Sequence, residues 1–278
     1  VHYTFSRETF NGPQFEAQMK KLQRKVVKQS LLEFFSTVSN KSALSYKVSA
    51  HLLLHEQTNE ELNRLAQNEA YLESAGFKSS SYQSIAAIFL VDEAHAKRAK
   101  ILHKEMKKQH HFLTGKDDIP YAVLLTREPV NAQLQAQTMR CYYDELVAQN
   151  FKRGDALQAM SQLLTLYNAD FEPIVIDYVS AICTYLKREN IKIRRKFYPF
   201  IAMLALAQAN EEVLNEIIRM NKELMTLPMF SIEPSLALMT ATQFVLQQLI
   251  EREALQQFSD SLLFLQALNM NDFLQDAK

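Results

Sequence analysis

The densest group of side chains that could do chemistry is the segment HHFLTGKDD, from His110 to Asp118. His111 could join the carboxylates of Asp117 and Asp118 around a divalent metal ion, because imidazole nitrogen and carboxylate oxygen both coordinate such ions. The same residues suit a helix boundary, since Thr114 and Asp117 have the spacing of a capping box and Asp118 would complement a helix dipole. The sequence favours the cap over the metal site.

A second group combines aromatic and basic residues that could contact a partner. Tyrosine provides both apolar area and a hydroxyl group, which suits a peptide-binding groove. The predicted partner-binding residues are Tyr142, Tyr178, Tyr185, Arg194 and Arg195. Packing between helices is the alternative role of the tyrosines.

Nucleic-acid binding is an alternative function, through basic clusters at 20–28, 97–108 and 187–196. If the fold aligned these clusters, they could follow a phosphate backbone. The formal net charge is +0, however, so no global field draws the chain to a polyanion or to a membrane surface. Solvated helix faces explain most of the basic residues equally well.

The elements that must position these residues are helices. The sequence has only 4 glycines and 7 prolines in 278 residues, which leaves little material for the turns of hairpin strands. Good helix formers dominate, and we expect an all-α fold. The longest apolar run, 200–207, is too short to span a bilayer, and the 2 cysteines lie in separate helical patterns. These features predict a cytoplasmic protein without a membrane segment.

Apolar segments recur with a period of 35 to 40 residues. They end at Leu54, Leu90, Leu125, Leu164, Leu204 and Phe244. Each is followed by an amphipathic segment, and this period is typical of helix-turn-helix repeats. The first clear unit has an apolar helix over about 82–91 and a charged helix over about 94–109. Gly76, Gly115 and Gly154 fall near junctions, where glycine suits the left-handed residue after a helix.

The repeats predict helical hairpins stacked as a tetratricopeptide-like α-solenoid, with an irregular multi-helix bundle as the alternative. We expect an N-terminal arm and capping helix over 1–40 and one repeat domain over 41–278. The repeat units lie near 41–76, 77–112, 113–150, 151–190, 191–230 and 231–278. An apolar terminal helix around Leu262 and Leu268 could support a homodimer.

The chain resembles a known bacterial family at three places. These are the segment HHFLTGKDD with the following AVLL, the segment AGFKSSSY from Ala75, and the segment ALQAMSQLL from Ala156. The family is the domain of unknown function catalogued as four thousand and three, found mainly in Gram-positive bacteria. The resemblance covers about residues 40–225. It implies a cytoplasmic, all-helical protein and assigns no catalytic residue.

No catalytic set is recognisable in the sequence. Neither cysteine has a neighbouring histidine, and no glycine-rich phosphate loop occurs. We therefore predict a non-enzymatic protein without a cofactor, which binds a protein or peptide partner. A divalent-metal or small-ligand site at His111, Asp117 and Asp118 is a further alternative.

Overall fold

The computed structural model describes residues 58–227, 230 and 234–251, and these residues form helices without a strand among them. The elements are α4 (Thr58–Ser74), α5 (Ser81–Phe89), α6 (Glu93–Gln109), α7 (Ile119–Leu124), α8 (Ala132–Ala148), α9 (Asp155–Leu164), α10 (Pro173–Arg188), the 3-10 helix η2 (Arg195–Phe197), α11 (Tyr198–Leu206), α12 (Glu211–Leu224) and α14 (Pro234–Glu251). The all-α prediction is confirmed. The arm over 1–40, the first repeat before Thr58 and the apolar terminal helix lie outside the described residues.

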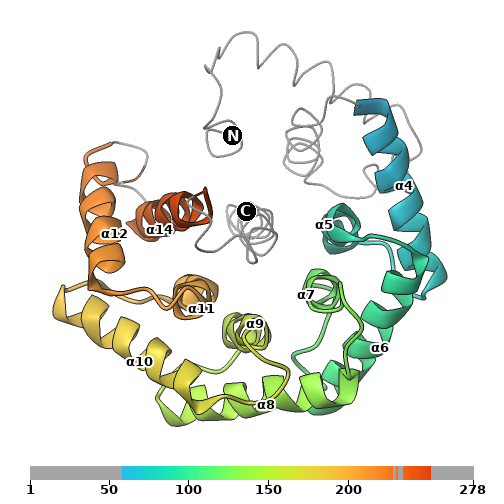
Figure 1. The fold of residues 1–278 in the computed structure, drawn as a ribbon, viewed down its shortest axis with the longest axis horizontal. Helices are drawn as coiled ribbons and strands as arrows, with labels where there is room; N and C mark the ends of the chain where they lie inside the picture. The colour runs from blue at the N-terminus through green and yellow to red at the C-terminus, as the bar shows by residue number, and fades with distance from the viewer. Residues whose placement is uncertain (1–57, 228–229, 231–233, 252–278) are drawn as a thin grey trace.

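The helices alternate between two rows that follow a common arc (Figure 1). The outer row contains α4, α6, α8, α10 and α12, and the inner row contains α5, α7, α9, α11 and α14. Figure 1 shows the outer helices lengthwise along the arc, whereas α5, α7, α9 and α11 are seen nearly end-on. The inner helices therefore cross the outer ones instead of lying along them.

Each outer helix packs on the inner helix that follows it in the chain, so the pairs are α4 with α5, α6 with α7, α8 with α9, α10 with α11 and α12 with α14. The sequence pattern suggested the other pairing, in which the helix over 82–91 forms a hairpin with the helix over 94–109. Both helices exist, but α5 packs mainly on α4 and α7, and α6 packs on α7 and α8. Periodicity shows that a face is buried and does not show which neighbour buries it.

The composition of each row follows from its position. All residues of α11, from Tyr198 to Leu206, are buried, because inner helices are covered on several sides. The outer helix α12 is amphipathic: Leu214, Ile217 and Ile218 are buried, and its other face carries charged side chains. Burial of complete apolar side chains such as these supplies about 1.5–3 kcal/mol each.

The buried faces of two outer helices agree only in part with the apolar spacing in the sequence. On α8 the spacing of Leu134, Cys141 and Tyr142 predicts an inward row, and Tyr142 is buried whereas Cys141 is exposed. On α10 the predicted row is Ile174, Tyr178, Ala181 and Tyr185, and Tyr185 is buried whereas Ile174 and Ala181 are exposed. Val175, Val179 and Ile182 are buried instead, which turns the buried face by about one residue, or roughly 100° around the helix.

Polar residues fix the helix starts. The side chains of Ser80, Asp92, Asn131 and Asn210 each accept a hydrogen bond from the backbone N–H three residues later. Such caps satisfy one of the backbone donors that a helix leaves unpaired. As expected, prolines lie at or next to the first residue of helices, at positions 120, 173, 199 and 234.

The helix ends use glycine less than expected. Gly76 has φ 91° after α4, as predicted, and the N–H of Phe77 returns to the carbonyl of Leu72. After α8, however, the left-handed residue is Asn150 (φ 68°), and Gly154 begins the next helix as the N-cap of α9. Asparagine tolerates this conformation better than most residues with a Cβ.

The described apolar core consists of two clusters. One joins α4, α5, α6 and α7 and includes Leu72, Leu102 and Val123, together with the first half of α8. The other is centred on the second half of α8 and on α9, α10, α11, α12 and α14, with Tyr142 and Phe200 among its members. Between them, near the starts of α7 and α9, lies a group of buried polar side chains. None of the helices in the described ranges is both long enough and apolar enough to cross a membrane.

Candidate functional site

Asp118 is the centre of the buried polar group between the two core clusters. It immediately precedes α7 and is only 4% exposed. Its Oδ1 accepts hydrogen bonds from the side-chain amides of Gln158 (2.7 Å) and Gln162 (2.6 Å), and its Oδ2 accepts one from the backbone N–H of Gly115 (2.7 Å). Because both glutamines belong to α9, the carboxylate links the start of α7 to α9.

The structure adds a contact to the expected cap. A carboxylate oxygen of Asp118 accepts the backbone N–H of Gly115, three residues earlier in the turn. The Thr114 hydroxyl accepts a hydrogen bond from Gln158 (3.4 Å). The polar residues of this turn therefore connect two helix pairs in addition to ending one helix and beginning the next.

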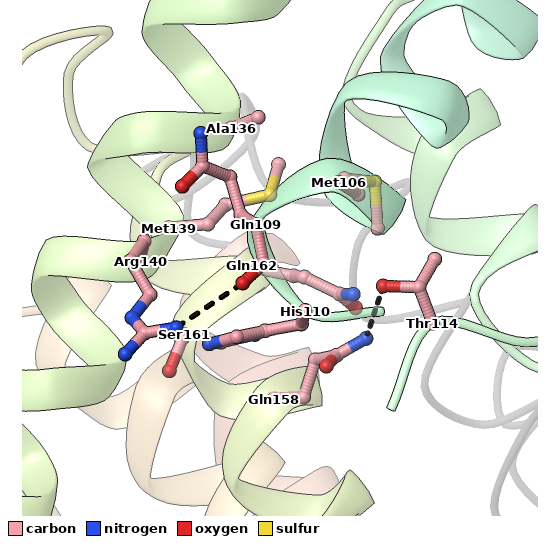
Figure 2. Close-up of a pocket in the computed structure, with 10 residues that line it drawn as sticks. All are labelled: Met106, Gln109, His110, Thr114, Ala136, Met139, Arg140, Gln158, Ser161 and Gln162. Atoms are coloured by element: carbon pink, nitrogen blue, oxygen red, sulfur yellow. Dashed lines mark hydrogen bonds between the residues drawn. The ribbon is translucent and has the colours of Figure 1, made fainter. Parts of the chain in front are cut away.

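A narrow pocket adjoins the group, between α6, α8 and α9 (Figure 2). Figure 2 shows Arg140 reaching the backbone oxygen of Gln109 and Gln158 reaching Thr114, with the His110 ring drawn between these contacts. The cavity volume is about 10 Å³, which is about the space that one water molecule requires. An organic substrate does not fit this volume.

Three buried atoms of pocket-lining residues have no hydrogen-bond partner within the described ranges: His110 Nε2, Gln158 Oε1 and Gln162 Oε1. Burial lowers the pKa of His110, the charge of Arg140 adds to this effect, and Asp144 and the nearby Gln158 oppose it. Burial raises the pKa of Asp118, although its hydrogen bonds from Gln162, Gly115 and Gln158 oppose the shift. Loss of water favours the neutral form of both residues.

This group of Asp118, Gly115, Gln158 and Gln162 connects two helices, and we call it the polar joint. The carboxylate accepts bonds at both oxygens, and the adjoining space has the size of about one water molecule. A general base needs an oxygen or nitrogen within hydrogen-bond reach of a bound substrate. Asp118 and its partners instead hold α7 and α9 together.

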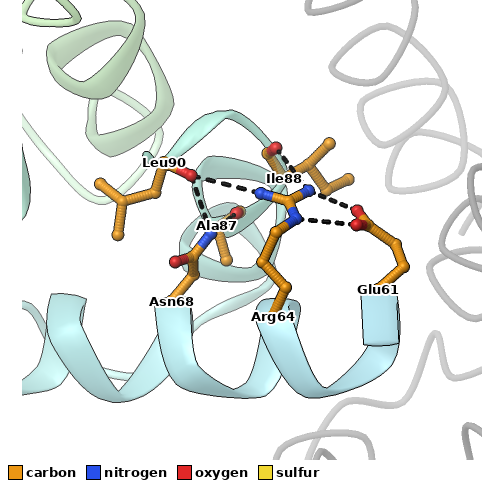
Figure 3. Close-up of polar contacts among 6 residues, drawn as sticks. All are labelled: Glu61, Arg64, Asn68, Ala87, Ile88 and Leu90. Atoms are coloured by element: carbon orange, nitrogen blue, oxygen red, sulfur yellow. Dashed lines mark hydrogen bonds and ion pairs between the residues drawn. The ribbon is translucent and has the colours of Figure 1, made fainter. Parts of the chain in front are cut away.

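A second kind of polar contact closes the carbonyl ends of inner helices (Figure 3). Asn68 of α4 donates to the carbonyls of Ala87 (2.9 Å) and Leu90 (2.8 Å) at the end of α5. Arg64, which is paired with Glu61, donates to Leu90 as well. These donors satisfy carbonyls that have no partner within their own helix.

Equivalent contacts to carbonyls occur in the next two helix pairs, α6 with α7 and α8 with α9, and other residues make them. His95 of α6 lies against Val123 O (Nε2 to oxygen, 2.8 Å), and Arg98 donates to the carbonyl of Thr126 (3.1 Å). Thr138 of α8 donates to the carbonyl of Ala169, after α9 (2.7 Å). In these three pairs, a polar residue of the outer helix thus binds the chain at or shortly after the end of the inner helix.

The predicted metal ligands occupy different environments. His111 is exposed and its ring contacts Phe112, Asp117 is half-buried, and Asp118 is buried against α9. Throughout the described part of the chain, no three His, Cys, Asp or Glu side chains are placed to hold a metal ion together.

The predicted partner-binding residues also separate into two groups. Tyr142 is fully buried and its hydroxyl accepts the N–H of Glu172 (3.2 Å), whereas Tyr185 is buried and donates to Asn215 (2.6 Å). Tyr178 is half-buried, and Arg194 and Arg195 are exposed. In the folded protein, Tyr142 and Tyr185 are covered by neighbouring helices, and Tyr178, Arg194 and Arg195 keep accessible surface.

The clearest exposed apolar side chain lies inside the same turn as the polar joint. Phe112 is 98% exposed, which is the largest value among the exposed large hydrophobic residues of the described part. Its neighbours His111 and Lys116 are also exposed. The sequence does not single out Phe112, because a lone phenylalanine carries no sign of its exposure and its neighbours His111, Asp117 and Asp118 have more obvious chemistry.

A wider groove, of about 940 Å³, lies between α12 and α14. Val213, Val245 and Leu249 form its apolar part, and Glu216 and Arg219 are on its polar side. The latter two residues pair with each other, and Arg219 also pairs with Glu223. These pairs neutralise much of the charge that could recognise an ionic ligand.

The fold and its polar joints define a class: an all-helical protein of paired helices in two rows. A family model described as Protein of unknown function (DUF4003) matches residues 3–270, and the chain belongs to this family. A similar protein in Bacillus subtilis (strain 168), described as Uncharacterized protein YeaA, is 28% identical over 107 residues, which cover 38% of this chain and 32% of the relative. The match thus spans about a third of that relative's length. No solved structure matches the chain.

Proposed function

We propose that the protein is a non-enzymatic, cytoplasmic interaction module that binds a protein or peptide partner on a tetratricopeptide-like array of helix pairs. The observation that carries the proposal is Phe112, whose side chain is 98% exposed. Interfaces commonly use an aromatic side chain as an anchor, because burying it removes a large apolar area from water. An uncovered phenylalanine at the tip of a turn is such an anchor.

The surroundings of Phe112 support a binding role. Hydrogen bonds fix the turn to two helices, because Asp118 binds Gln158 of α9 and the carbonyl of Gly115 binds His103 of α6. A rigid turn loses little conformational entropy when a partner binds. The buried Asp118 and the side chains of Asn68, Arg98 and Thr138 join helices, which is consistent with a scaffold.

Photo-crosslinking at position 112 tests the proposal. A photoreactive phenylalanine analogue replaces Phe112 in cells of the native host, and an identical substitution at Val91, which is 58% exposed after α5, serves as the control. We expect a specific protein adduct at position 112 and not at 91. Binding of the purified partner should weaken about tenfold or more in Phe112→Ala, and Val91→Ala should bind normally.

Adducts that are the same at both positions, or a purified partner that binds Phe112→Ala as well as wild type, would contradict the proposal. Circular dichroism of Phe112→Ala checks that the loss does not arise from unfolding. Because the replaced side chain contacts solvent, we expect the helical signal and the thermal midpoint to remain unchanged.

A further inference from the structure

The turns that join four outer helices to their inner helices are connected one to the next by side-chain contacts. These turns are 75–80, 110–118, 149–154 and 189–197, and we call the surface that they form the joining edge. Individual side chains bridge neighbouring turns. His103 contacts Phe77 in the first turn and Gly115 O in the second (2.8 Å).

The same bridging continues along the arc. Tyr143 stacks edge-on against His110 in the second turn, and its hydroxyl accepts the N–H of Gly154 in the third (3.2 Å). Tyr198, at the end of the fourth turn, accepts the N–H of Lys152 in the third (3.3 Å). The four turns therefore form one continuous surface.

The joining edge is rich in positive charge. Its exposed basic residues are Lys78, Lys116, Lys152, Arg153, Lys192, Arg194, Arg195 and Lys196. The carboxylates of these turns are Asp117, Asp118, which is buried, and Glu189, and the exposed Asp155 follows on the first turn of α9. The formal net charge of +0 for the whole chain conceals this local excess.

The opposite edge has the reverse character. It contains the links 90–92, 125–131, 165–172 and 207–210, in which Arg127 is the basic residue. Exposed acidic residues there and in the adjoining first turns of outer helices are Asp92, Glu93, Glu128, Asp170, Glu211 and Glu212. Acidic residues at outer-helix starts complement the helix dipole, which accounts for part of this edge.

Ion pairs engage several basic residues on the helices and leave four basic residues of the joining edge available to a partner. Lys97, Lys108, Arg140 and Arg219 each form an ion pair within their own helix. Lys116, Lys152, Arg153 and Arg195 form no ion pair with another residue of the described part. The ends of the outer helices and the starts of the inner helices both lie at this edge, so their dipoles largely cancel and the basic side chains carry the excess of positive charge. Attraction of an anionic partner is the consequence.

We propose that the joining edge binds an acidic segment of a partner protein, with an apolar residue of that segment packed on Phe112. This inference rests on the proposed function and specifies the chemistry of the partner. Neighbouring helices are about 10 Å apart, so four turns span roughly 30 Å. An extended segment of about nine residues covers that length at about 3.3 Å per residue.

Two observations favour an acidic protein segment over a nucleic acid. Sequence-tolerant binding of single strands uses several aromatic side chains on which bases stack. On the joining edge, Tyr143 and Tyr198 are buried and hold the turns together, so Phe112 is the fully exposed aromatic residue among the described turns. Asp117 and Glu189 would also repel a nucleic acid, which has a phosphate charge at every nucleotide. An acidic peptide can instead place neutral residues beside these two carboxylates.

Fluorescence anisotropy of the full chain tests the inference. The probe is a labelled peptide of about ten residues, with Asp and Glu at most positions and a central Leu-Phe. The comparison probes are the same peptide with Asn and Gln in place of the acids, and a single-stranded RNA oligonucleotide. We expect binding of the acidic peptide that weakens as salt rises, and little binding of the neutral peptide.

Matched charge reversals locate the site. The double variant Lys152→Glu and Arg153→Glu should weaken peptide binding about tenfold, because it reverses two unpaired charges of the edge. Lys97→Glu with Lys104→Glu changes the net charge by the same amount on the exposed face of α6 and should bind like wild type. Phe112→Ala should weaken binding about fivefold or more.

Each other result overturns the inference. Absence of acidic-peptide binding at low salt, or equal loss in both double variants, removes the joining edge as its site. Tighter binding of the RNA, with sensitivity to Lys152→Glu and Arg153→Glu, reassigns the edge to nucleic acid. If the partner crosslinked at position 112 binds the Lys152→Glu, Arg153→Glu variant normally, the proposed function stands and the acidic-segment inference fails.

Discussion

Asp118 illustrates how a single residue can connect two parts of a chain. It is buried, yet both carboxylate oxygens have hydrogen-bond donors from Gly115, Gln158 and Gln162. Burial of a charge is costly unless its hydrogen bonds are made, so the two glutamines and the carboxylate depend on one another.

Asp118→Asn tests this dependence. Asparagine keeps the shape but replaces one acceptor oxygen with an amide donor, which would face donors of Gly115 or the glutamines. We expect a loss of about 1–3 kcal/mol in the free energy of unfolding, measured by urea denaturation. Asp155→Asn, at an exposed position on the first turn of α9, should change it by less than about 0.5 kcal/mol. Equal effects would refute the special role of Asp118.

Glu69 makes a prediction about pH. Burial raises its pKa from the ordinary 4.5 to about 7, Ser84 opposes this by donating a hydrogen bond, and the charge of Glu73 adds to it. Because the folded-state pKa is the higher one, the folded protein prefers neutral Glu69. Neutral Glu69 therefore makes its full contribution to the free energy of unfolding below pH 4.5, and this contribution is lost as the pH rises through about 7.

Glu69→Gln should therefore stabilise the protein above pH 7 and have little effect at pH 5, with a difference of up to about 3 kcal/mol. The measurement is the unfolding free energy of variant and wild type across this range. Burial lowers the pKa of His95 and His103, so these residues destabilise the folded protein as the pH falls below 6.5. Both proteins contain these histidines, so their contribution cancels in the difference between variant and wild type. A difference that does not depend on pH would show that Glu69 titrates normally.

At the scale of elements, the sequence predicted the helices more closely than their neighbours. The helices expected over about 82–91 and 94–109 occur as α5 (Ser81–Phe89) and α6 (Glu93–Gln109). Local propensity and apolar spacing specify such segments. Packing partners depend on the three-dimensional course of the links, so α6 was paired with α5 in the sequence pattern and packs on α7 and α8 in the structure.

The polar joint shows the same division between local and distant information. The turn with Thr114, Asp117 and Asp118 could be located from the sequence, but its partners on α9 are forty and more residues away. A signal was nevertheless present, since Gln158 and Gln162 are four residues apart in a largely apolar helix and share one face. That spacing indicates a buried polar row when the helix belongs to the inner layer.

The end of α8 provides a prediction about backbone conformation. Asn150 has φ 68°, where a side chain with a Cβ is strained and asparagine is tolerated. Asn150→Ala should lower the free energy of unfolding by about 1 kcal/mol, and Asn150→Gly should preserve or raise it. Gln149→Ala is the control, because Gln149 has φ −84° in the same turn. Equal effects of the two alanine substitutions in thermal unfolding would argue against backbone strain at position 150.

At the scale of the whole molecule, two apolar clusters meet near a polar joint. One cluster includes Leu102 and Val123, and the other includes Tyr142 and Phe200. Apolar contacts can be exchanged for similar ones, but the donors of Gln158 and Gln162 need the carboxylate of Asp118. This requirement aligns the two halves of the arc.

Hydrogen exchange should reveal this arrangement. In Asp118→Asn, backbone amides near the start of α7 and in the first half of α9 should exchange faster together, because both lose the same partner. Amides in α12, which lies at a distance along the arc, should keep their wild-type rates. Mass spectrometry of peptic fragments measures each region separately, and a uniform increase across all helices would instead indicate global destabilisation.

The side chains that bind carbonyls at the ends of inner helices bear on how proteins of this architecture could gain or lose helices. Asn68 closes α5, Arg98 closes the end of α7, and Thr138 binds the chain after α9, each from within the same pair. If a complete helix pair is duplicated or deleted, the donor side chain and the carbonyls that it binds are gained or lost together. If only one helix of the pair is gained or lost, carbonyls at the end of an inner helix are left without their donor. Evolutionary gain and loss in this architecture should therefore proceed in whole pairs, and members of different length should differ by an outer helix together with the inner helix that follows it.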